Sequence, residues 1–186
     1  MRYRAPKAGL LTNDVTTMNT MNVGSLARAS VLLLALGLLN CGCGTTKPKP
    51  VAWNLSLTKT TQSSIVVDLI GVSDRAKTVW ESYDLDQYWK PGDQRRQDAH
   101  PLSQDLVYQE PWLLSREDPK WKEWLDHGAT DLLIIANLPG TNFGSGAADP
   151  RRRFVPLDKN AWRAKNRKLE IEIQDTLINV LNKPRN

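Results

Sequence analysis

The two cysteines are the side chains with the most distinctive chemistry in this sequence. Cys41 and Cys43 are the only cysteines among the 186 residues, and a single residue separates them. This spacing is too close for relaxed disulfide geometry. Two thiols alone provide neither a disulfide framework nor a cysteine-based metal site. The chemistry of interest is therefore covalent modification of one thiol.

An apolar run immediately precedes these cysteines. Residues 31–39, VLLLALGLL, contain no polar side chain. A helix needs about 20 apolar residues to span a bilayer core, whereas the apolar region of a secretory signal peptide has about 7–15. With Leu38 three positions before Cys41, the run is similar to a bacterial lipoprotein signal, although Asn40 stands where a small residue is usual. In that class the thiol receives a diacylglycerol, and cleavage just before the cysteine makes it the new N-terminus.

We therefore predict that Cys41 is lipidated, with Cys43 as the alternate site. The competing interpretations are a buried helix and an ordinary cleaved signal with incidental cysteines. Gly42, rather than an aspartate, follows Cys41. In enteric-type bacteria this directs a lipoprotein to the outer membrane, so we expect the chain to be anchored there and to face the periplasm.

The signal sets the expected organisation of the chain. Residues 1–20 are unlike the short leading region of a signal, so we expect translation to start at Met21 or Met18, unless a long leader is functional. Residues 1–40 are then the signal peptide. Residues 41–50 carry the lipidated cysteine and a Gly-, Thr-, Lys- and Pro-rich tether. Residues 51–186 are enough for one folded periplasmic domain.

The basic balance of the chain comes largely from the signal. The full chain has 25 basic and 20 acidic residues. Residues 1–40 contribute four of the basic ones and one of the acidic ones, which leaves 21 and 19 and a net charge of +2. This small excess is no support for a nucleic-acid partner, and we expect none.

No other residues have the spacing of a catalytic or metal-binding motif. His100 and His127 lack ligand-spaced partners, and His127 stands at a predicted helix end that suits a partly positive imidazole. No glycine-rich phosphate loop and no Gly-x-Ser-x-Gly elbow occurs. Four carboxylates are expected to be solvated surface: Asp84, Asp86, Glu117 and Asp118. We predict no catalytic residue, no metal, no cofactor beyond the lipid on Cys41, and a protein that is not an enzyme.

Tryptophans and an arginine run are the other conspicuous features. All seven tryptophans follow the cysteines. Five lie in the predicted helices or in the irregular segment beside Pro111, and we expect them to be core residues, with binding of sugars or a protein as the alternative: Trp80, Trp89, Trp112, Trp121 and Trp124. Residues 151–153 are three arginines, expected to be a solvated charge run rather than a contact for lipid phosphates or an acidic partner.

Hydrophobic periodicity places the elements. Alternation predicts a half-buried strand over residues 51–59, and β-branched residues predict a central strand over 64–72. Further strands are expected over 106–114 (where Pro111 confines it to an edge or breaks it), 131–138, 168–174 and 177–181. A helix is expected over 74–89, with Ser73 as its N-cap. A second helix is expected over 117–127, because residues 115–118 have the Ser-x-x-Asp spacing of a capping box and Gly128 is suited to end a helix. Residues 93–101 and 139–149 are expected to be loops.

Five or six strands with one or two helical insertions, and no regular β-α-β alternation, predict a mainly β fold. We expect an antiparallel β-sandwich, with a mixed α+β sheet as the competing interpretation.

This order of parts resembles the outer-membrane lipoproteins of type VI secretion systems, the TssJ family. The resemblance is carried by residues 51–57, 65–72 and 132–137, and above all by 160–163, Asn-Ala-Trp-Arg, leading into 169–173. It implies a transthyretin-like sandwich without enzymatic activity. It also implies a structural role, in which the lipoprotein binds the periplasmic domain of a TssM-like inner-membrane protein.

The resemblance implies a contact site as well. In the family the loop between the first two strands matters for this contact, and here it spans residues 58–64. The implied partner-binding residues are Thr60, Thr61, Gln62 and Ser63 from this loop, with Asn142 and Phe143 from the loop over 139–150; the insertion over 91–101 is a further candidate. The alternative function is a lipid-anchored periplasmic binding module for peptidoglycan or polysaccharide.

Overall fold

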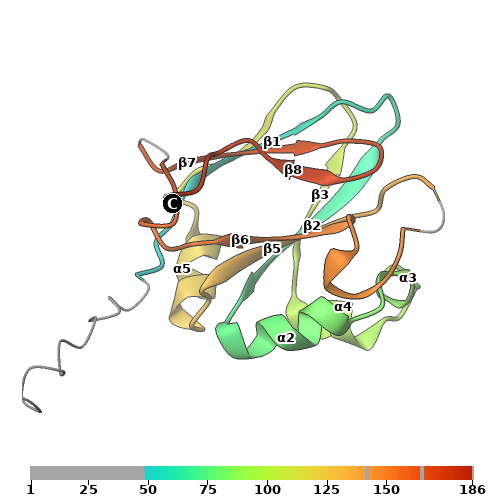
Figure 1. The fold of residues 1–186 in the computed structure, drawn as a ribbon, viewed down its shortest axis with the longest axis horizontal. Coiled ribbons are helices and arrows are strands. Elements are labelled where there is room, and N and C mark those ends of the chain that lie inside the picture. The colour runs from blue at the N-terminus through green and yellow to red at the C-terminus, as the bar shows by residue number, and fades with distance from the viewer. Residues whose placement is uncertain (1–48, 141–142, 164–165, 186) are drawn as a thin grey trace, which may run out of the picture. The chain divides into compact units, whose positions relative to one another are not determined.

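The computed structural model describes residues 49–140, 143–163 and 166–185, which contain eight β-strands in two four-stranded sheets (Figure 1). The predictions for residues 1–40, Cys41, Cys43 and Asn142 therefore lie outside the described residues. The first sheet has the order β4 (Trp112–Leu114), β1 (Asn54–Lys59), β7 (Lys168–Ile173), β8 (Ile178–Val180). The second has the order β3 (Leu102–Leu106), β2 (Ile65–Val72), β5 (Asp131–Ala136), β6 (Arg152–Pro156).

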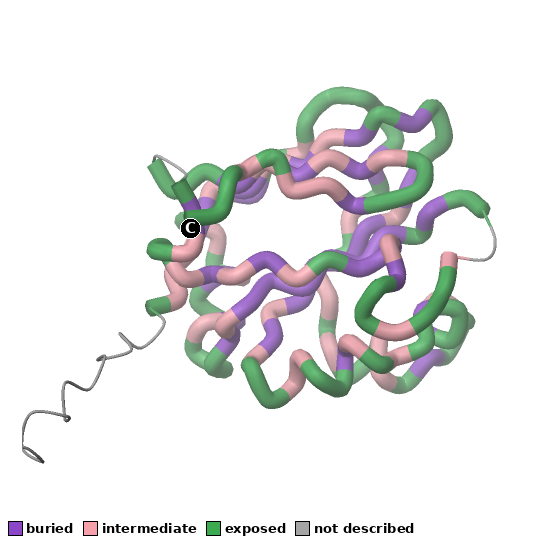
Figure 2. Tube along the Cα trace, in the orientation of Figure 1, coloured by how far each residue is buried: buried purple, intermediate pink, exposed green. Residues whose placement is uncertain are grey.

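The two sheets share one apolar core. Alternate residues of β1 and β7, such as Leu55, Leu57 and Ile171, point inward and are buried. They join one cluster with alternate residues of the second sheet, such as Val67 and Ile134. Buried segments accordingly run along both sheets in Figure 2. The prediction of a mainly β sandwich is confirmed.

One strand pairing differs from the all-antiparallel prediction. β1 and β7 are parallel, with Asn54 opposite Lys168 and Lys59 opposite Ile173, whereas the other paired strands are antiparallel. Parallel neighbours need a long crossover between them. Here the whole second sheet lies between β1 and β7 in the sequence, so alternation within each strand could not reveal the pairing.

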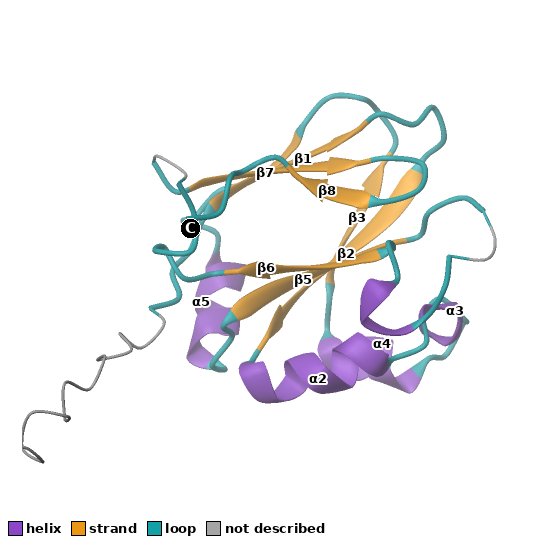
Figure 3. Ribbon diagram, viewed as in Figure 1, coloured by secondary structure: helices purple, strands orange, loops and turns teal. Residues whose placement is uncertain are grey.

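A helical layer covers the outer face of the second sheet (Figure 3). The predicted helix over 74–89 is two helices, α2 (Asp74–Ser82) and α3 (Leu85–Tyr88). Ser73 caps α2 as predicted, accepting a hydrogen bond from the Ala76 N–H at 3.4 Å. A second apolar cluster packs α2 and α3 on this face, which explains why β5 is buried along its whole length.

One prediction for the following segment is wrong, and for another the second of its two alternatives holds. Residues 93–101, expected to be a loop, contain the helix α4 (Gln94–Ala99), whose first turn is capped by the Asp93 carboxylate. Residues 106–114, expected to be a strand that Pro111 confines to an edge or breaks, hold the end of β3, a connection over 107–111, and β4. Pro111, which precedes β4, has no N–H for a strand ladder; it marks the break.

The predicted second helix is α5 (Pro119–Asp126), and it closes one end of the core with Trp121 and Trp124. Asp118 caps it by accepting from the Lys120 N–H at 2.8 Å. Gly128 follows the helix with φ of 80°, a left-handed conformation that glycine adopts without strain. With a 3₁₀ turn, η1 (Gly146–Ala148), the described residues hold more helices than the one or two insertions predicted. None of those helices has the length and apolar character needed to cross a membrane.

The sandwich has two distinct ends (Figure 1). At one, here called the tether end, the chain enters the domain at Lys49, and Pro50 pairs with Asp158. At the other, the loop end, β1 finishes and the Thr60 N–H donates to the Ile173 carbonyl at 3.0 Å. β1 therefore runs away from the tether, and at about 3.3 Å per residue its six residues separate the two ends by about 20 Å.

Candidate functional site

Four chain connections meet at the loop end. Residues 60–64 join β1 to β2, and residues 174–177 join β7 to β8 beside them, because Lys59 pairs with Ile173. Residues 107–111 join β3 to β4, next to the start of β2, because Leu106 pairs with Ile65. The β5–β6 connection starts at the same end, where the Asn137 N–H donates to the Val66 carbonyl at 2.9 Å.

The predicted contact residues of the β1–β2 loop are only partly available. Thr60, Gln62 and Ser63 are exposed. Thr61 is buried, and its hydroxyl accepts from the Ser63 N–H at 3.3 Å, so it shapes the loop instead of presenting a side chain. The Lys59 ammonium donates to the Ser63 carbonyl at 2.8 Å and thereby links the end of β1 to the loop.

Exposed apolar side chains lie beside these polar ones. Tyr108 is 75% exposed, Val107 50% and Leu177 38%. Large apolar side chains that stay in water at a single face favour a protein interaction surface. We define the loop-end surface as Thr60, Gln62, Ser63, Val107, Tyr108 and Leu177.

Sequence reasoning missed the three apolar members of this surface. Val107 and Tyr108 were assigned to a strand, and Leu177 to the continuation of another, although each lies in a connection. Pro111 predicts a break in this strand, but it does not show that the break begins as early as Val107.

Phe143 of the long β5–β6 loop is packed instead of free. Phe143, a predicted contact residue, is partly buried against the core, and the Arg151 guanidinium lies 4.9 Å from its ring centroid. Gly140 has φ of 129°, and a Cβ there would come within 3.1 Å of the Phe143 ring. The ring therefore needs a glycine opposite it, and it serves the loop's own packing.

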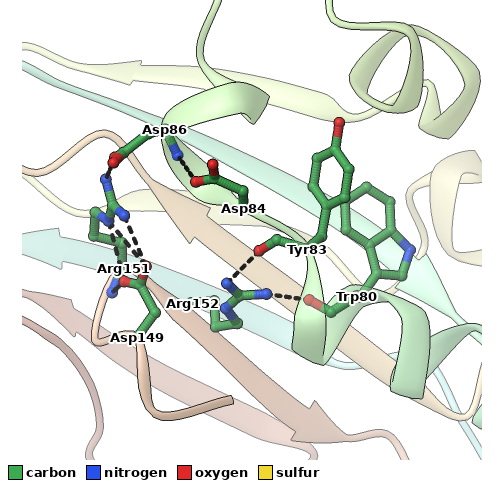
Figure 4. Close-up of polar contacts among 7 residues, drawn as sticks. All are labelled: Trp80, Tyr83, Asp84, Asp86, Asp149, Arg151 and Arg152. Atoms are coloured by element: carbon green, nitrogen blue, oxygen red, sulfur yellow. Dashed lines mark hydrogen bonds and ion pairs between the residues drawn. The ribbon is translucent and has the colours of Figure 1, made fainter. Parts of the chain in front are cut away.

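The arginine run is not a solvated charge run, and that prediction is wrong for two of its three members. Arg151 and Arg152 are 7% and 5% exposed, and only Arg153 is exposed. Arg151 donates to Asp149 at 2.7 Å and also to Asp86 of α3 (Figure 4). The hydrogen bonds that Arg151 donates to Asp149 raise the pKa of Arg151 above its ordinary value against the opposing effect of burial, and Asp86 adds to the increase.

Arg152 binds the helical layer through the end of α2. Its guanidinium donates to the Tyr83 carbonyl at 2.6 Å and to the Trp80 carbonyl, the last turn of α2 (Figure 4). Helix ends leave carbonyls without intrahelical partners, so a buried cation there satisfies them. Burial lowers the pKa of Arg152 from its ordinary value. The two arginines together fasten α2 and α3 to the start of β6.

A buried carboxylate holds the rest of the layer. Asp68 of β2 is fully buried and accepts from the Tyr88 hydroxyl at 2.7 Å, the Arg96 Nε at 2.8 Å and the Ser103 hydroxyl at 2.5 Å. These partners come from α3, α4 and β3. Burial and the neighbouring Asp68 raise the pKa of Tyr88 well above its usual value.

The residues first considered for catalysis have structural contacts. His100 and His127 are exposed, and the His127 Nδ1 lies 2.7 Å from the Glu123 carbonyl of its own helix. Of the four carboxylates, Asp84 and Asp118 cap helices, Asp86 pairs with Arg151, and Glu117 pairs with Arg116 at 2.7 Å. In the described ranges no group of three His, Cys, Asp or Glu side chains could hold a metal ion.

The tryptophans are mostly core residues, as predicted. Five of the seven are buried: Trp53, Trp80, Trp121, Trp124 and Trp162. Trp89 and Trp112 are half-buried. Most of the tryptophans are therefore too buried to contribute to a sugar-binding face.

Comparisons with known proteins were made for both sequence and structure. No protein-family model matches the sequence, and no curated protein matches it. The structure is similar to the crystal structure of the T6SS lipoprotein TssJ1 from Pseudomonas aeruginosa, with a TM-score of 0.45 and 9% identity over 74% of this chain and 100% of that chain. It is similar to a chain of a type VI membrane complex, with a TM-score of 0.47 and 13% identity over 72% and 99% of the two chains.

A third similar structure is Serratia marcescens Lip, a membrane-bound component of the type VI secretion system, with a TM-score of 0.42 and 11% identity over 73% and 99% of the chains.

Proposed function

We propose that this chain is a structural lipoprotein of the type VI secretion membrane complex. A lipid on Cys41 anchors it in the outer membrane, and its loop-end surface binds the periplasmic domain of a TssM-like inner-membrane protein. The observation that carries the proposal is the position of the loop-end surface. Tyr108, Val107 and Leu177 are exposed at the end of the domain opposite to the entry of the tether. A partner from across the periplasm would meet that end first.

The test is recovery of the partner from detergent-solubilised membranes by the full-length acylated chain, followed by mass spectrometry. A Val107→Ser, Tyr108→Ser variant removes two exposed apolar side chains without touching the core. Central aromatic contacts are worth about 2 kcal/mol or more each, so we expect recovery to fall by at least about thirtyfold.

Leu181→Ser is the matched control, because Leu181 is also an exposed apolar residue (49%) but lies towards the tether end, after β8. It should leave recovery unchanged. A separate Cys41→Ser variant should lose metabolic lipid labelling, and labelling that persists would assign the anchor to Cys43. The proposal fails if the unaltered chain recovers no inner-membrane protein with a large periplasmic domain, or if the loop-end variant recovers as much as the control.

The alternative, a binding module for peptidoglycan or polysaccharide, keeps only Trp112 and Tyr108 as accessible aromatics near the loop end. Intrinsic fluorescence during titration with cell-wall fragments separates the two functions, because a sugar stacking on Trp112 would shift its emission.

A further inference from the structure

We propose that the tether end of the domain binds anionic lipid headgroups and seats the domain upright on the membrane that holds its anchor. The proposal rests on the lipid anchor of the proposed function. It does not depend on the identity of the protein partner.

Three segments distant in sequence form the tether end. The first residues of the domain run beside the strand end at Leu157, whose carbonyl accepts from the Val51 N–H at 3.1 Å. The C-terminal residues lie on the segment after it, where the Arg163 N–H donates to the Lys183 carbonyl at 2.9 Å. The Arg185 N–H donates in turn to the Ala161 carbonyl at 2.8 Å.

These segments bring exposed cations together. The basic patch consists of Lys49, Lys159, Arg163, Arg167, Lys183 and Arg185, all exposed. Within the part of the chain that the structure describes, none of the six takes part in an ion pair. The nearby carboxylates are occupied by other groups, since Glu117 pairs with Arg116 and Asp158 accepts from the Asn160 N–H at 3.1 Å.

A hollow of about 690 Å³ lies within this end. Its charged lining is Arg116, Lys159, Arg167 and Arg185, with Trp53 and two asparagines completing the wall. Guanidinium groups present several N–H donors in a planar fork that matches phosphate oxygens. Several such groups around one hollow suit a phosphate headgroup better than an isolated surface lysine would.

The loop end has the opposite character. In its connections over 60–64, 107–111 and 174–177, the only charged residues are Glu110 and Asp175. Six exposed cations that form no ion pair among the described residues therefore lie at the pole that the tether joins, whereas these loop-end connections contain no cation; Lys90 and Arg153 are exposed cations away from that pole. Charge spread evenly over the surface would have given no preferred orientation.

The tether places this pole within reach of the bilayer. Seven residues lie between Cys41 and Lys49, and the eight steps along the chain allow at most about 28 Å when extended and about 16 Å on average for a flexible chain. Screening acts over about 8 Å at physiological salt. Tethering also keeps the local headgroup concentration high. Each lysine or arginine near an anionic surface then strengthens binding about fivefold.

The test uses the acylated full-length protein reconstituted in vesicles of phosphatidylcholine, with or without phosphatidylglycerol. An amine-reactive reagent labels exposed lysines, and mass spectrometry follows Lys159 and Lys183. Lys90, exposed after α3, is the internal control. We expect phosphatidylglycerol to slow labelling of Lys159 and Lys183 at least about fivefold, to leave Lys90 unchanged, and to lose this effect at about 0.5 M salt.

A variant tests whether the patch is responsible. Arg167→Asn with Arg185→Gln removes two charges, and asparagine tolerates the φ of 50° at position 167. Binding should weaken about twentyfold, so that Lys159 is labelled at its unprotected rate. The matched control, Lys90→Gln with Arg153→Gln, removes two exposed charges away from the tether end and should keep Lys159 protected.

Each outcome is decisive. Equal labelling of Lys159 in both vesicle types, or loss of protection in the control variant, overturns the inference alone, because the protein would still float with the vesicles through its lipid. A chain that carries no lipid and does not float overturns the anchor and the inference together. Failure to recover a protein partner, with Lys159 protected, would refute the proposed partner and leave the inference standing.

Discussion

Replacing Gly71 by alanine tests how closely α5 packs on the central strand β2. Gly71 lies in β2, on the face that α5 covers, between the buried Ile70 and Val72 of the opposite face. A Cβ at this position would lie 2.5 Å from the Cβ of Trp124 and 2.7 Å from its Cδ1. Carbon atoms pack best at about 3.5–4.0 Å, so α5 would have to withdraw by about 1 Å.

The size of the expected destabilisation depends on which Trp124 atom the new Cβ would contact. The Trp124 Cβ is fixed to the helix backbone, so a change of side-chain rotamer cannot relieve the contact. Overpacking a core costs about 1–3 kcal/mol, and we expect Gly71→Ala to lie at the upper end, with a loss of about 2–3 kcal/mol in the free energy of unfolding. The gain from replacing a strand glycine offsets less than about 1 kcal/mol of this.

Urea unfolding followed by circular dichroism measures the effect, with unchanged m-values showing that the native state is intact. In a Trp124→Ala background α5 can withdraw more easily, so the cost of Gly71→Ala should fall by at least about 1 kcal/mol. A Gly71→Ala protein within about 0.5 kcal/mol of the parent chain would refute the packing described for α5.

Two further predictions concern charged groups. Asp68→Asn removes the buried anion that Arg96, Tyr88 and Ser103 share, and it should lower the free energy of unfolding in urea by about 3 kcal/mol. Asp105→Asn, at an exposed position of β3, should lower it by less than about 0.5 kcal/mol. Equal losses for the two variants would contradict the hydrogen-bond network of Asp68. Hydrogen bonds from Arg116 and Ser115 lower the pKa of Glu117 to about 2, so its contribution is present above the ordinary value of 4.5 and is lost as pH falls towards 2. An NMR titration should show this low pKa moving up in high salt, because the group is exposed; an ordinary pKa at low salt would exclude the pair.

The sequence predicted those elements whose partners are apolar. β1, β2, β5 and β7 follow from alternation or β-branched runs, and Ser73 marks the start of α2 correctly. In each case burial of a regular face decides the structure. The tryptophans of α5 entered the core for the same reason.

The misses involve elements held by polar partners. α4 has no buried residue of its own, and it is attached through Arg96 to an anion on β2 that lies 28 residues earlier. Arg151 and Arg152 read as surface charges because Asp86 and the carbonyls of Trp80 and Tyr83 are more than 60 residues away. Only Asp149, the other partner of Arg151, lies nearby in the sequence. Periodicity carries no information about such pairs.

The candidate surface was located in part. The β1–β2 loop was assigned correctly, but no local pattern shows that residues 107–111 and 174–177 lie beside it. That neighbourhood depends on the register of strands far apart in the sequence. Likewise, the cations of the basic patch come from both termini of the domain and the segment before β7, and only the fold brings them together.

The parallel pairing of β1 has a consequence for biogenesis. Neither neighbour of this strand exists until late in synthesis, since β4 starts at Trp112 and β7 at Lys168. A nascent chain thus leaves the ribosome with its leading strand unmatched, and long-range pairing of this kind is slow. The sheet around β1 can therefore be completed only after Ile173 has been synthesised.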